Sequence, residues 1–165
     1  MESEPGKGSR FWLDLRPAPS QNHADMRSAT VLYVEDEEFD AMFMHRAFER
    51  LGLEGSLKVV GDGQQAIDYL AGNGVYADRR EHPLPAVILL DLKLPVVSGF
   101  EVLEWLRQQP GLKGLPVVVF SSSDQPEDQA KASELGANDF VQKPSSALEF
   151  PKVVERLRGQ WMMAQ

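Results

Sequence analysis

Two runs in this chain are apolar at every position until a polar residue ends them. They are "AVILLD" at 86–91 and "LPVVVFS" at 115–121. A strand with one face in water alternates apolar and polar side chains, whereas a strand covered on both faces has no need of polar positions. Continuous apolar strands are typical of parallel sheets that carry helices on both faces. The two runs therefore favour an α/β fold with buried central strands.

Three shorter strand-like runs, at residues 30–36, 56–60 and 139–143, accompany these two. Helical patterns lie between and after the strands. Residues 37–51 repeat apolar side chains at helical spacing, namely Phe39, Phe43, Ala47 and Leu51. Further helices are indicated by Asp62 with Gln65, Ser98 with Glu101, Pro126, and the apolar face that begins at Phe150. Strand and helix thus alternate five times, which predicts a parallel sheet with helices on both faces.

The chain is long enough for one domain and a short extension. It has 165 residues, of which 42% are apolar, enough to bury a sizeable core. Residues 1–27 are rich in Gly, Pro, Ser and charge and show no sustained period, so we expect a flexible tail there. A translation start at Met26 would remove most of it. Residues 28–163 are expected to form the domain, with a polar loop at 72–85.

The composition excludes several classes of protein. A net charge of −8 argues against a general affinity for nucleic acid, which requires a basic surface. The chain has no cysteine, so it has neither disulfides nor thiolate metal sites. It has no apolar run long enough to span a membrane and no apolar signal-peptide core near its start. We therefore expect a cytoplasmic protein.

Polar residues end the predicted strands and, in a parallel sheet, lie together at one edge. They are Glu35, Asp36, Asp91, Ser121 and Lys143. Each alone has an ordinary structural reading, since acids begin helices or form turns and a lysine is usually exposed. Together they favour a site, because clustered carboxylates repel one another unless a hard cation such as Mg²⁺ binds them. The hydroxyl and the ammonium suit an anion, so an aspartate that accepts a phosphoryl group is expected here.

At these residues the chain resembles the receiver domain of two-component response regulators. The resemblance covers about residues 29–160 and is carried by "VLYVEDEE", "VILLDLKLP", "SGFEVLEWLR", "LPVVVFSSS" and "GANDFVQKP". It implies a flavodoxin-like five-stranded parallel sheet with strand order 2-1-3-4-5. It also implies a phosphorelay protein that catalyses only its own phosphorylation and dephosphorylation. Such a protein is not an enzyme with an external substrate.

The resemblance also implies a role for each site residue. Asp91 would be the phosphoacceptor, and Mg²⁺ would be held by Glu35, Asp36, Asp91 and the backbone carbonyl of Lys93. Ser121 would be the switch hydroxyl, with Ser122 beside it on the path of the attacking water. Phe140 would be the aromatic switch residue. Lys143 would pair with the phosphoryl group, and the bond before Pro144 would be cis.

A finer resemblance links the chain to stand-alone regulators that serve phytochrome-like sensor kinases. It rests on the long loop at 72–85 and the ending "FPKVVERLRGQWMMAQ". The expected partner is a sensor histidine kinase, and phosphorylation is expected to change the surface of the fourth helix, fifth strand and last helix. The ending "QWMMAQ" has two readings: Trp161 packs on its own sheet while the methionines, Met162 among them, fray, or these apolar residues form a homodimer surface.

Three other functions are weighed against this one. A phosphohydrolase of the haloacid dehalogenase type needs a second carboxylate two residues after Asp91, where this chain has Lys93. A flavin carrier needs a glycine- and hydroxyl-rich phosphate loop where this chain has "EDEEFD" at 35–40. A receiver-like protein that is never phosphorylated remains the third alternative, and the intact set of site residues disfavours it.

Overall fold

The structure, a computed structural model, describes residues 29–163, so the predicted tail at 1–27 lies outside the described residues. Five strands form one parallel sheet in the order β3-β2-β4-β5-β6. In chain order this is 2-1-3-4-5, as the resemblance implied. The strands are β2 (Val31–Val34), β3 (Leu57–Val60), β4 (Val87–Leu90), β5 (Val117–Ser121) and β6 (Asp139–Gln142).

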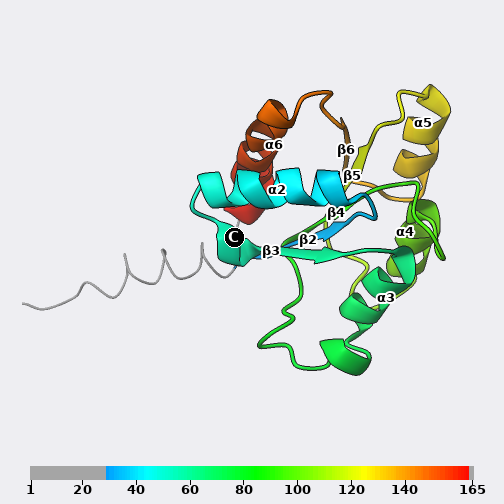
Figure 1. The fold of residues 1–165 in the computed structure, drawn as a ribbon. Coiled ribbons are helices and arrows are strands. Elements are labelled where there is room, and N and C mark those ends of the chain that lie inside the picture. The colour runs from blue at the N-terminus through cyan, green and yellow to red at the C-terminus, as the bar shows by residue number, and fades with distance from the viewer. Residues whose placement is uncertain (1–28, 164–165) are drawn as a thin grey trace, which may run out of the picture.

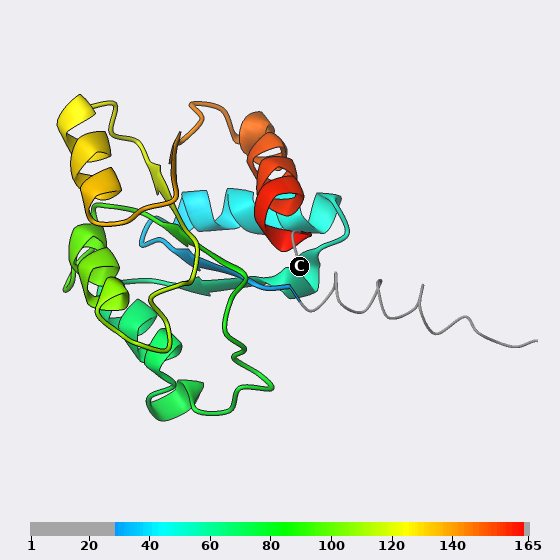
Figure 2. The same ribbon diagram turned by 180° about the vertical axis from the view of Figure 1, so that it is seen from behind.

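Helices cover both faces of this sheet (Figure 1). One face carries α2 (Glu38–Arg50) and α6 (Phe150–Leu157), which lie side by side also when seen from behind (Figure 2). The other face carries α3 (Gly63–Ala71), α4 (Gly99–Arg107) and α5 (Pro126–Glu134). Shorter helical turns are η1 (Glu54–Ser56), η2 (Gly74–Tyr76), η3 (Ala147–Glu149) and the π-helical η4 (Arg158–Met162).

The central strands are buried on both sides, as their apolar runs require. In β2, Val31 and Tyr33 face the α2 and α6 layer, whereas Leu32 and Val34 face the α3 and α4 layer. All residues of β2, β4 and β5 are buried. Among the described residues, no helix has the length and apolar character needed to cross a membrane.

The predicted helix starts are confirmed at two caps. The Asp62 side chain accepts a hydrogen bond from the backbone N–H of Gln65 at 2.8 Å, and the Gln65 side chain donates back to Asp62. Ser98 accepts from the N–H of Glu101 in the same way. These bonds satisfy backbone donors that a helix leaves free in its first turn.

The predicted buried face of α2 is confirmed except at its first residue. Ala47 is buried, and Phe43 and Leu51 pack partly buried against the same core cluster. Phe39 is instead 70% exposed. Phe39 lies in the first turn, beside the carboxyl edge of the sheet, where there is less of the core to cover it.

The segment 72–85 is fixed to α3 by one arginine. The Arg79 guanidinium donates to the carbonyl oxygens of Tyr69, Leu70 and His82 at 2.7–3.0 Å. Tyr69 and Leu70 lie at the end of α3, whose last carbonyls lack helical partners. The expected polar loop therefore has a defined path.

Two expectations near the C-terminus are corrected. Met162 is buried in the core beside α2 and α6, so its side chain does not form a surface for a second copy; Trp161 packs against the same cluster. No peptide bond within residues 29–163 is cis, so the expected cis bond before Pro144 is wrong. The trans isomer of a bond to proline is the lower in energy, by about 0.5–1 kcal/mol.

Candidate functional site at the carboxyl edge of the sheet

The sheet itself positions the backbone of three predicted site residues. The N–H of Glu35 donates to the carbonyl of Val60, and the N–H of Asp91 donates to that of Val34. The N–H of Lys143 donates in turn to the carbonyl of Ser121 at 2.8 Å. Each residue thus continues the hydrogen-bond ladder one step beyond its strand, so these side chains start from fixed points on one edge.

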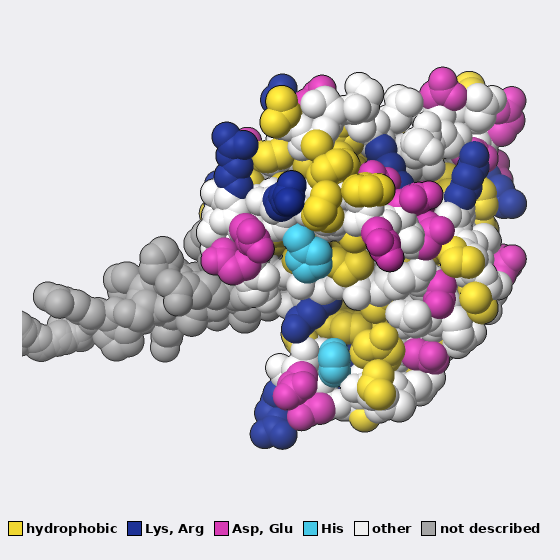
Figure 3. All heavy atoms as spheres, in the orientation of Figure 1, with side chains coloured by type: hydrophobic (Ala, Val, Ile, Leu, Met, Phe, Trp, Pro, Cys, Tyr) yellow, Lys and Arg dark blue, Asp and Glu magenta, His cyan; other side chains and the backbone are white. Residues whose placement is uncertain are grey.

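Three carboxylates meet at this edge. Glu35, Asp36 and Asp91 each offer an oxygen within 4.8 Å of the others. Glu35 and Asp91 are buried and Asp36 is exposed. Figure 3 shows acidic side chains gathered over the start of α2, at this edge. Hard oxygen ligands at such spacing are what Mg²⁺ or Mn²⁺ prefers.

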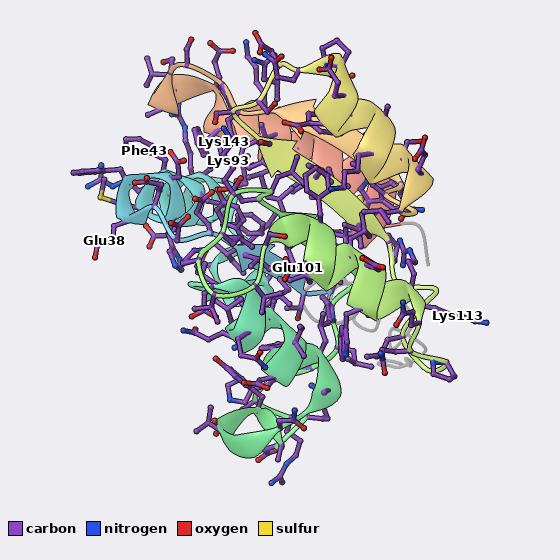
Figure 4. The ribbon with its side chains drawn as sticks, turned by 90° about the vertical axis from the view of Figure 1, so that its right-hand side faces the viewer. Glu38, Phe43, Lys93, Glu101, Lys113 and Lys143 are labelled. Atoms are coloured by element: carbon purple, nitrogen blue, oxygen red, sulfur yellow. The ribbon has the colours of Figure 1, made fainter. Side chains whose placement is uncertain are left out.

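Lys143 brings a positive charge into the same place. Its ammonium nitrogen lies 2.7 Å from Glu35 Oε1, 2.9 Å from Asp40 Oδ2 and 3.3 Å from Asp91 Oδ2. Lys93 and Lys143 lie at this end of the sheet, whereas Lys113 lies at the other (Figure 4). The side chain of Lys93 is exposed, and its backbone N–H donates to Asp91 Oδ1 at 3.4 Å.

Burial and charge shift the protonation of this cluster. Burial raises the pKa of Glu35, and the hydrogen bond from Lys143 opposes that shift. Burial alone would lower the pKa of Lys143, but its bonds to Glu35 and Asp40 and the charge of Asp91 outweigh burial and raise it. Tyr33 donates its hydroxyl to Glu35 at 2.8 Å, and burial beside this carboxylate raises its own pKa. Lys143 is therefore a fixed cation at neutral pH.

The opposite wall of the site is built of hydroxyls. Ser121 is fully buried, and its oxygen accepts the N–H of Ser123 at 3.1 Å. Ser123 in turn donates its hydroxyl to Asp128 in α5 at 2.5 Å and accepts the N–H of Gln125. Ser122 is exposed between them. A chain of hydrogen bonds thus joins the predicted switch hydroxyl to the first turn of α5.

Phe140 lies on the same side as α5. It is half-buried and packs against a small cluster of Leu92, Val119 and Ala132. Only Ala132 of that cluster comes from α5. The predicted aromatic switch residue therefore packs on a cluster that is built from β5, from the loop after Asp91 and from α5.

The loop after Asp91 turns sharply to reach α4. A side chain at Gly99 would lie 2.1 Å from the carbonyl oxygen of Asp91, so only glycine allows this close approach. Between them, the N–H of Val97 donates to the carbonyl of Pro95 at 2.8 Å, closing a three-residue turn around Val96. Val96 has a φ of 70°, which is strained for a β-branched residue.

The structure thus brings together Glu35, Asp36, Asp91 and Lys143, with Ser121 on the neighbouring strand end. Asp40 was missed, because an acid in the first turn of a helix reads as a helix start. A signal was present: Asp40 falls in the first turn of the helix that directly follows Glu35 and Asp36, so it stays near the same edge of the sheet. Ser123 and Asp128 were also missed, and their contact follows from a loop path that no periodicity encodes.

Known proteins match this chain over most of its length. The family model described as "Response regulator receiver domain" matches residues 31–155. The chain is 37% identical over 135 residues to the "Probable methanogenesis regulatory protein FilR2" of Methanothrix harundinacea, covering 80% of this chain and 83% of that protein. It is 32% identical over 132 residues to the "Response regulator Rcp1" of Synechocystis, covering 80% and 88%.

Solved structures agree with the fold. Response regulator RPA3017 "in red light signaling of R. palustris" has a TM-score of 0.76 at 33% identity. The phosphorylated cyanobacterial phytochrome response regulator RcpA has a TM-score of 0.75 at 30% identity. The Mn²⁺-bound form of Rcp1 has a TM-score of 0.72 at 31% identity. Each match covers 83% of this chain and 96% of the other.

The strand order, the three carboxylates and the lysine at the carboxyl edge therefore agree with the family match. This chain belongs to the response regulator receiver domain family, the signalling proteins of two-component systems.

Proposed function

We propose that this protein is a phosphorylation-controlled switch, in which Asp91 accepts a phosphoryl group from a histidine kinase. The observation that carries the proposal is the position of Asp91, which is buried, fixed by the β2 backbone and 3.3 Å from the Lys143 ammonium. A carboxylate held rigidly next to a fixed cation is suited to attack phosphorus, because positioning and electrostatics supply most of the catalysis in phosphoryl transfer.

The donor set at this edge fits a divalent cation. Glu35, Asp36 and Asp91 would hold Mg²⁺, together with the backbone carbonyl of Lys93. When bound, the cation would neutralise charge on the phosphoryl oxygens. The Mn²⁺-bound structure of the similar Rcp1 supports a hard cation here.

The chain's own residues account for the transfer. An Asp91 oxygen forms the new bond to phosphorus while the phosphorus–nitrogen bond of phosphohistidine breaks, and the electron pair stays on the imidazole. The Lys143 ammonium stabilises negative charge on the transferred group. Ser122 and Lys93 border the path of the water that later hydrolyses the acyl phosphate.

The switch follows from the added charge. The Ser121 hydroxyl turns from Ser123 toward the phosphoryl oxygens, and Phe140 moves inward behind it. The surface of α5, β6 and α6 then changes, as a biased two-state equilibrium. Because Phe140 packs on a cluster that includes Ala132 of α5, its movement is expected to displace that helix.

Acetyl phosphate tests the proposal directly. With Mg²⁺, the intact mass of the wild type is expected to increase by one phosphoryl group, and that of Asp91→Asn is expected to stay unchanged. Asp78→Asn is the matched control, because Asp78 is an aspartate in the segment 72–85, away from the site. An unchanged wild-type mass, or uptake by Asp91→Asn, contradicts the assignment.

The expected donor is a phytochrome-like sensor histidine kinase in the cytoplasm. The similar RPA3017 and RcpA, which are described by red light signalling and as a phytochrome response regulator, support this choice. A homodimer through the last helix near Trp161 stays a prediction, as does the absence of nucleic-acid binding. Phosphotransfer from a phytochrome-like kinase and from an unrelated kinase, compared over seconds, tests the donor. Equal rates from both would contradict it.

A further inference from the structure

The roles assigned above leave Asp40 without one, although it contacts the phosphoryl-binding lysine. Asp40 lies in the first turn of α2, and its Oδ2 is 2.9 Å from the Lys143 ammonium across 103 residues of chain. Its side chain is 27% exposed, whereas that of Lys143 is 10% exposed. This contact is therefore a partly buried ion pair between the site and a core helix.

We propose that Asp40 is a positioning residue, which holds Lys143 beside Asp91 when a divalent cation occupies the carboxylates. The inference rests on the proposed function and deepens it. An ammonium has three N–H donors, and here three carboxylates lie within 2.7–3.3 Å of it. Without a cation, the donors of Lys143 are fully used.

A bound divalent cation would weaken two of the three contacts of the Lys143 ammonium. Glu35 and Asp91 belong to the carboxylate set that would bind the cation, together with Asp36. Once their charge is directed to a divalent ion, they attract the ammonium less, and the ion itself repels it. Asp40 is the partner of Lys143 that lies outside that set, so its attraction remains.

The backbone of Asp40 is well fixed for this task. It sits on α2, whose Met44, Ala47 and Phe48 are buried in the core. Held by Asp40 alone, the ammonium would keep two donors free, and these can turn to the oxygens of an incoming phosphoryl group. Asp40 thus acts through Lys143 and does not touch the reacting atoms.

The Lys143 ammonium can be observed without any phosphoryl donor. Its ¹⁵N–¹H NMR signal, assigned by its absence from Lys143→Met, is expected in the wild type with and without saturating Mg²⁺, because a paired ammonium exchanges its protons slowly. In Asp40→Asn the signal is expected without Mg²⁺ and lost with it. A wild-type signal lost on adding Mg²⁺ overturns the proposal. A variant signal that survives Mg²⁺, or that is missing already without it, does the same.

Kinetics give a second readout. At saturating Mg²⁺, the maximal rate of Asp91 phosphorylation by acetyl phosphate is expected to fall about tenfold in Asp40→Asn, the effect of weakening one charge-assisted hydrogen bond. Asp40→Glu is expected to restore most of it. Glu38→Gln is the matched control, since it removes the same charge from the same turn of α2 at an exposed position (Figure 4).

The two readouts separate this inference from the function on which it rests. A wild type that takes up no phosphoryl group contradicts the proposed function, while the NMR comparison still decides the role of Asp40. An Asp40→Asn rate equal to that of the wild type overturns the positioning role even if Asp91 is the acceptor. An equal loss in Glu38→Gln also overturns it, because the effect would then come from charge near the site and not from the contact.

Discussion

The helices α2 and α5 both begin at the carboxyl edge, and both carry an aspartate bonded to that edge, but the core holds them very differently. α2 has 13 residues and buries Met44, Ala47 and Phe48. α5 has nine residues and buries Ala132. Large apolar side chains contribute about 1.5–3 kcal/mol each when fully buried, so α2 is anchored more firmly than α5.

The bonds at the two helix starts also favour α2 over α5. Asp40 of α2 binds a buried ammonium, whereas Asp128 of α5 binds a serine hydroxyl. Both bonds are charge-assisted, but the bond of Asp40 joins two opposite charges, whereas that of Asp128 joins a charge to a neutral hydroxyl. The site therefore has a firm wall, formed by Asp40 of α2 with Lys143, and a weaker wall, formed by Ser123 with Asp128 of α5. Under the proposed function, the firm wall would hold the reacting groups in place and the weaker wall would rearrange on phosphorylation.

The largest effect on the free energy of unfolding is expected from Lys143→Met, which removes the cation of the firm wall. Glu35, which is 2% exposed, would lose its cation, and removing one partner of a buried ion pair costs about 3–5 kcal/mol. Urea denaturation at about pH 7 measures this loss. Lys113→Met, at the other end of the sheet (Figure 4), is expected to change the free energy of unfolding little. Equal free energies of unfolding for the two variants would mean that the ion pairs of Lys143 do not stabilise the fold.

The pH dependence of this variant has a definite sign. Burial raises the pKa of Glu35 and Lys143 opposes the shift, so without Lys143 the pKa of Glu35 rises further. The folded state then holds this proton more tightly than the unfolded state, which favours folding at low pH and is lost as pH rises through the folded-state pKa. The deficit of Lys143→Met is therefore expected to be smaller at about pH 5 than at about pH 8.

The wild type has the complementary dependence at high pH. Because the pKa of Lys143 is raised, its contribution to stability is complete below the ordinary lysine value of about 10.4 and is lost as pH rises through the raised value. A wild type whose stability advantage over Lys143→Met does not shrink in alkaline urea titrations would contradict this reading.

The weaker wall is tested by Asp128→Asn. Weakening the 2.5 Å bond from Ser123 is expected to cost about 1 kcal/mol and to speed amide hydrogen exchange in α5, while exchange in α2 stays unchanged. Glu127→Gln removes the neighbouring charge of the same turn and serves as control. Equal exchange in the two variants would show that the Ser123 contact does not hold α5.

The three clustered carboxylates repel one another, and Asp36→Asn tests how much this repulsion destabilises the fold. Charges within 4.8 Å repel by about 1 kcal/mol per pair even in bulk water. Without divalent cation the variant is expected to unfold at a higher temperature than the wild type, and with Mg²⁺ that advantage should shrink or reverse. Glu37→Gln, an exposed neighbour, is the control. If Mg²⁺ does not reduce the gain in unfolding temperature, the gain does not come from repulsion among these carboxylates.

The firm wall could be predicted from sequence better than the weaker one, for a physical reason. Glu35, Asp36, Asp91 and Lys143 each follow a strand, and parallel topology places strand ends on one edge. The apolar runs that define the strands therefore also locate these side chains. The family resemblance added their roles, which the geometry accommodates.

What the sequence did not predict depends on contacts between distant segments. The partner of Asp40 is 103 residues away, and the bond between Ser123 and Asp128 depends on the path of a loop. The exposure of Phe39 likewise follows from what packs against it. Periodicity reports which side of an element is apolar, and it does not report where the sheet ends.

The smallest effect is expected in the loop between β4 and α4, through Val96→Gly. Val96 has a φ of 70° in the turn closed by Pro95 and Val97, a conformation that costs a residue with a Cβ about 1–2 kcal/mol. Glycine removes this strain but adds about 0.4–1 kcal/mol of unfolded-state entropy. The net change is therefore a gain of 0 to about 1.6 kcal/mol, measurable as a higher urea midpoint with an unchanged slope. Val75→Gly, at another exposed valine whose φ is not positive, should lose stability by the entropy alone. If Val96→Gly is destabilised as much as Val75→Gly, the turn after Asp91 stores no backbone strain.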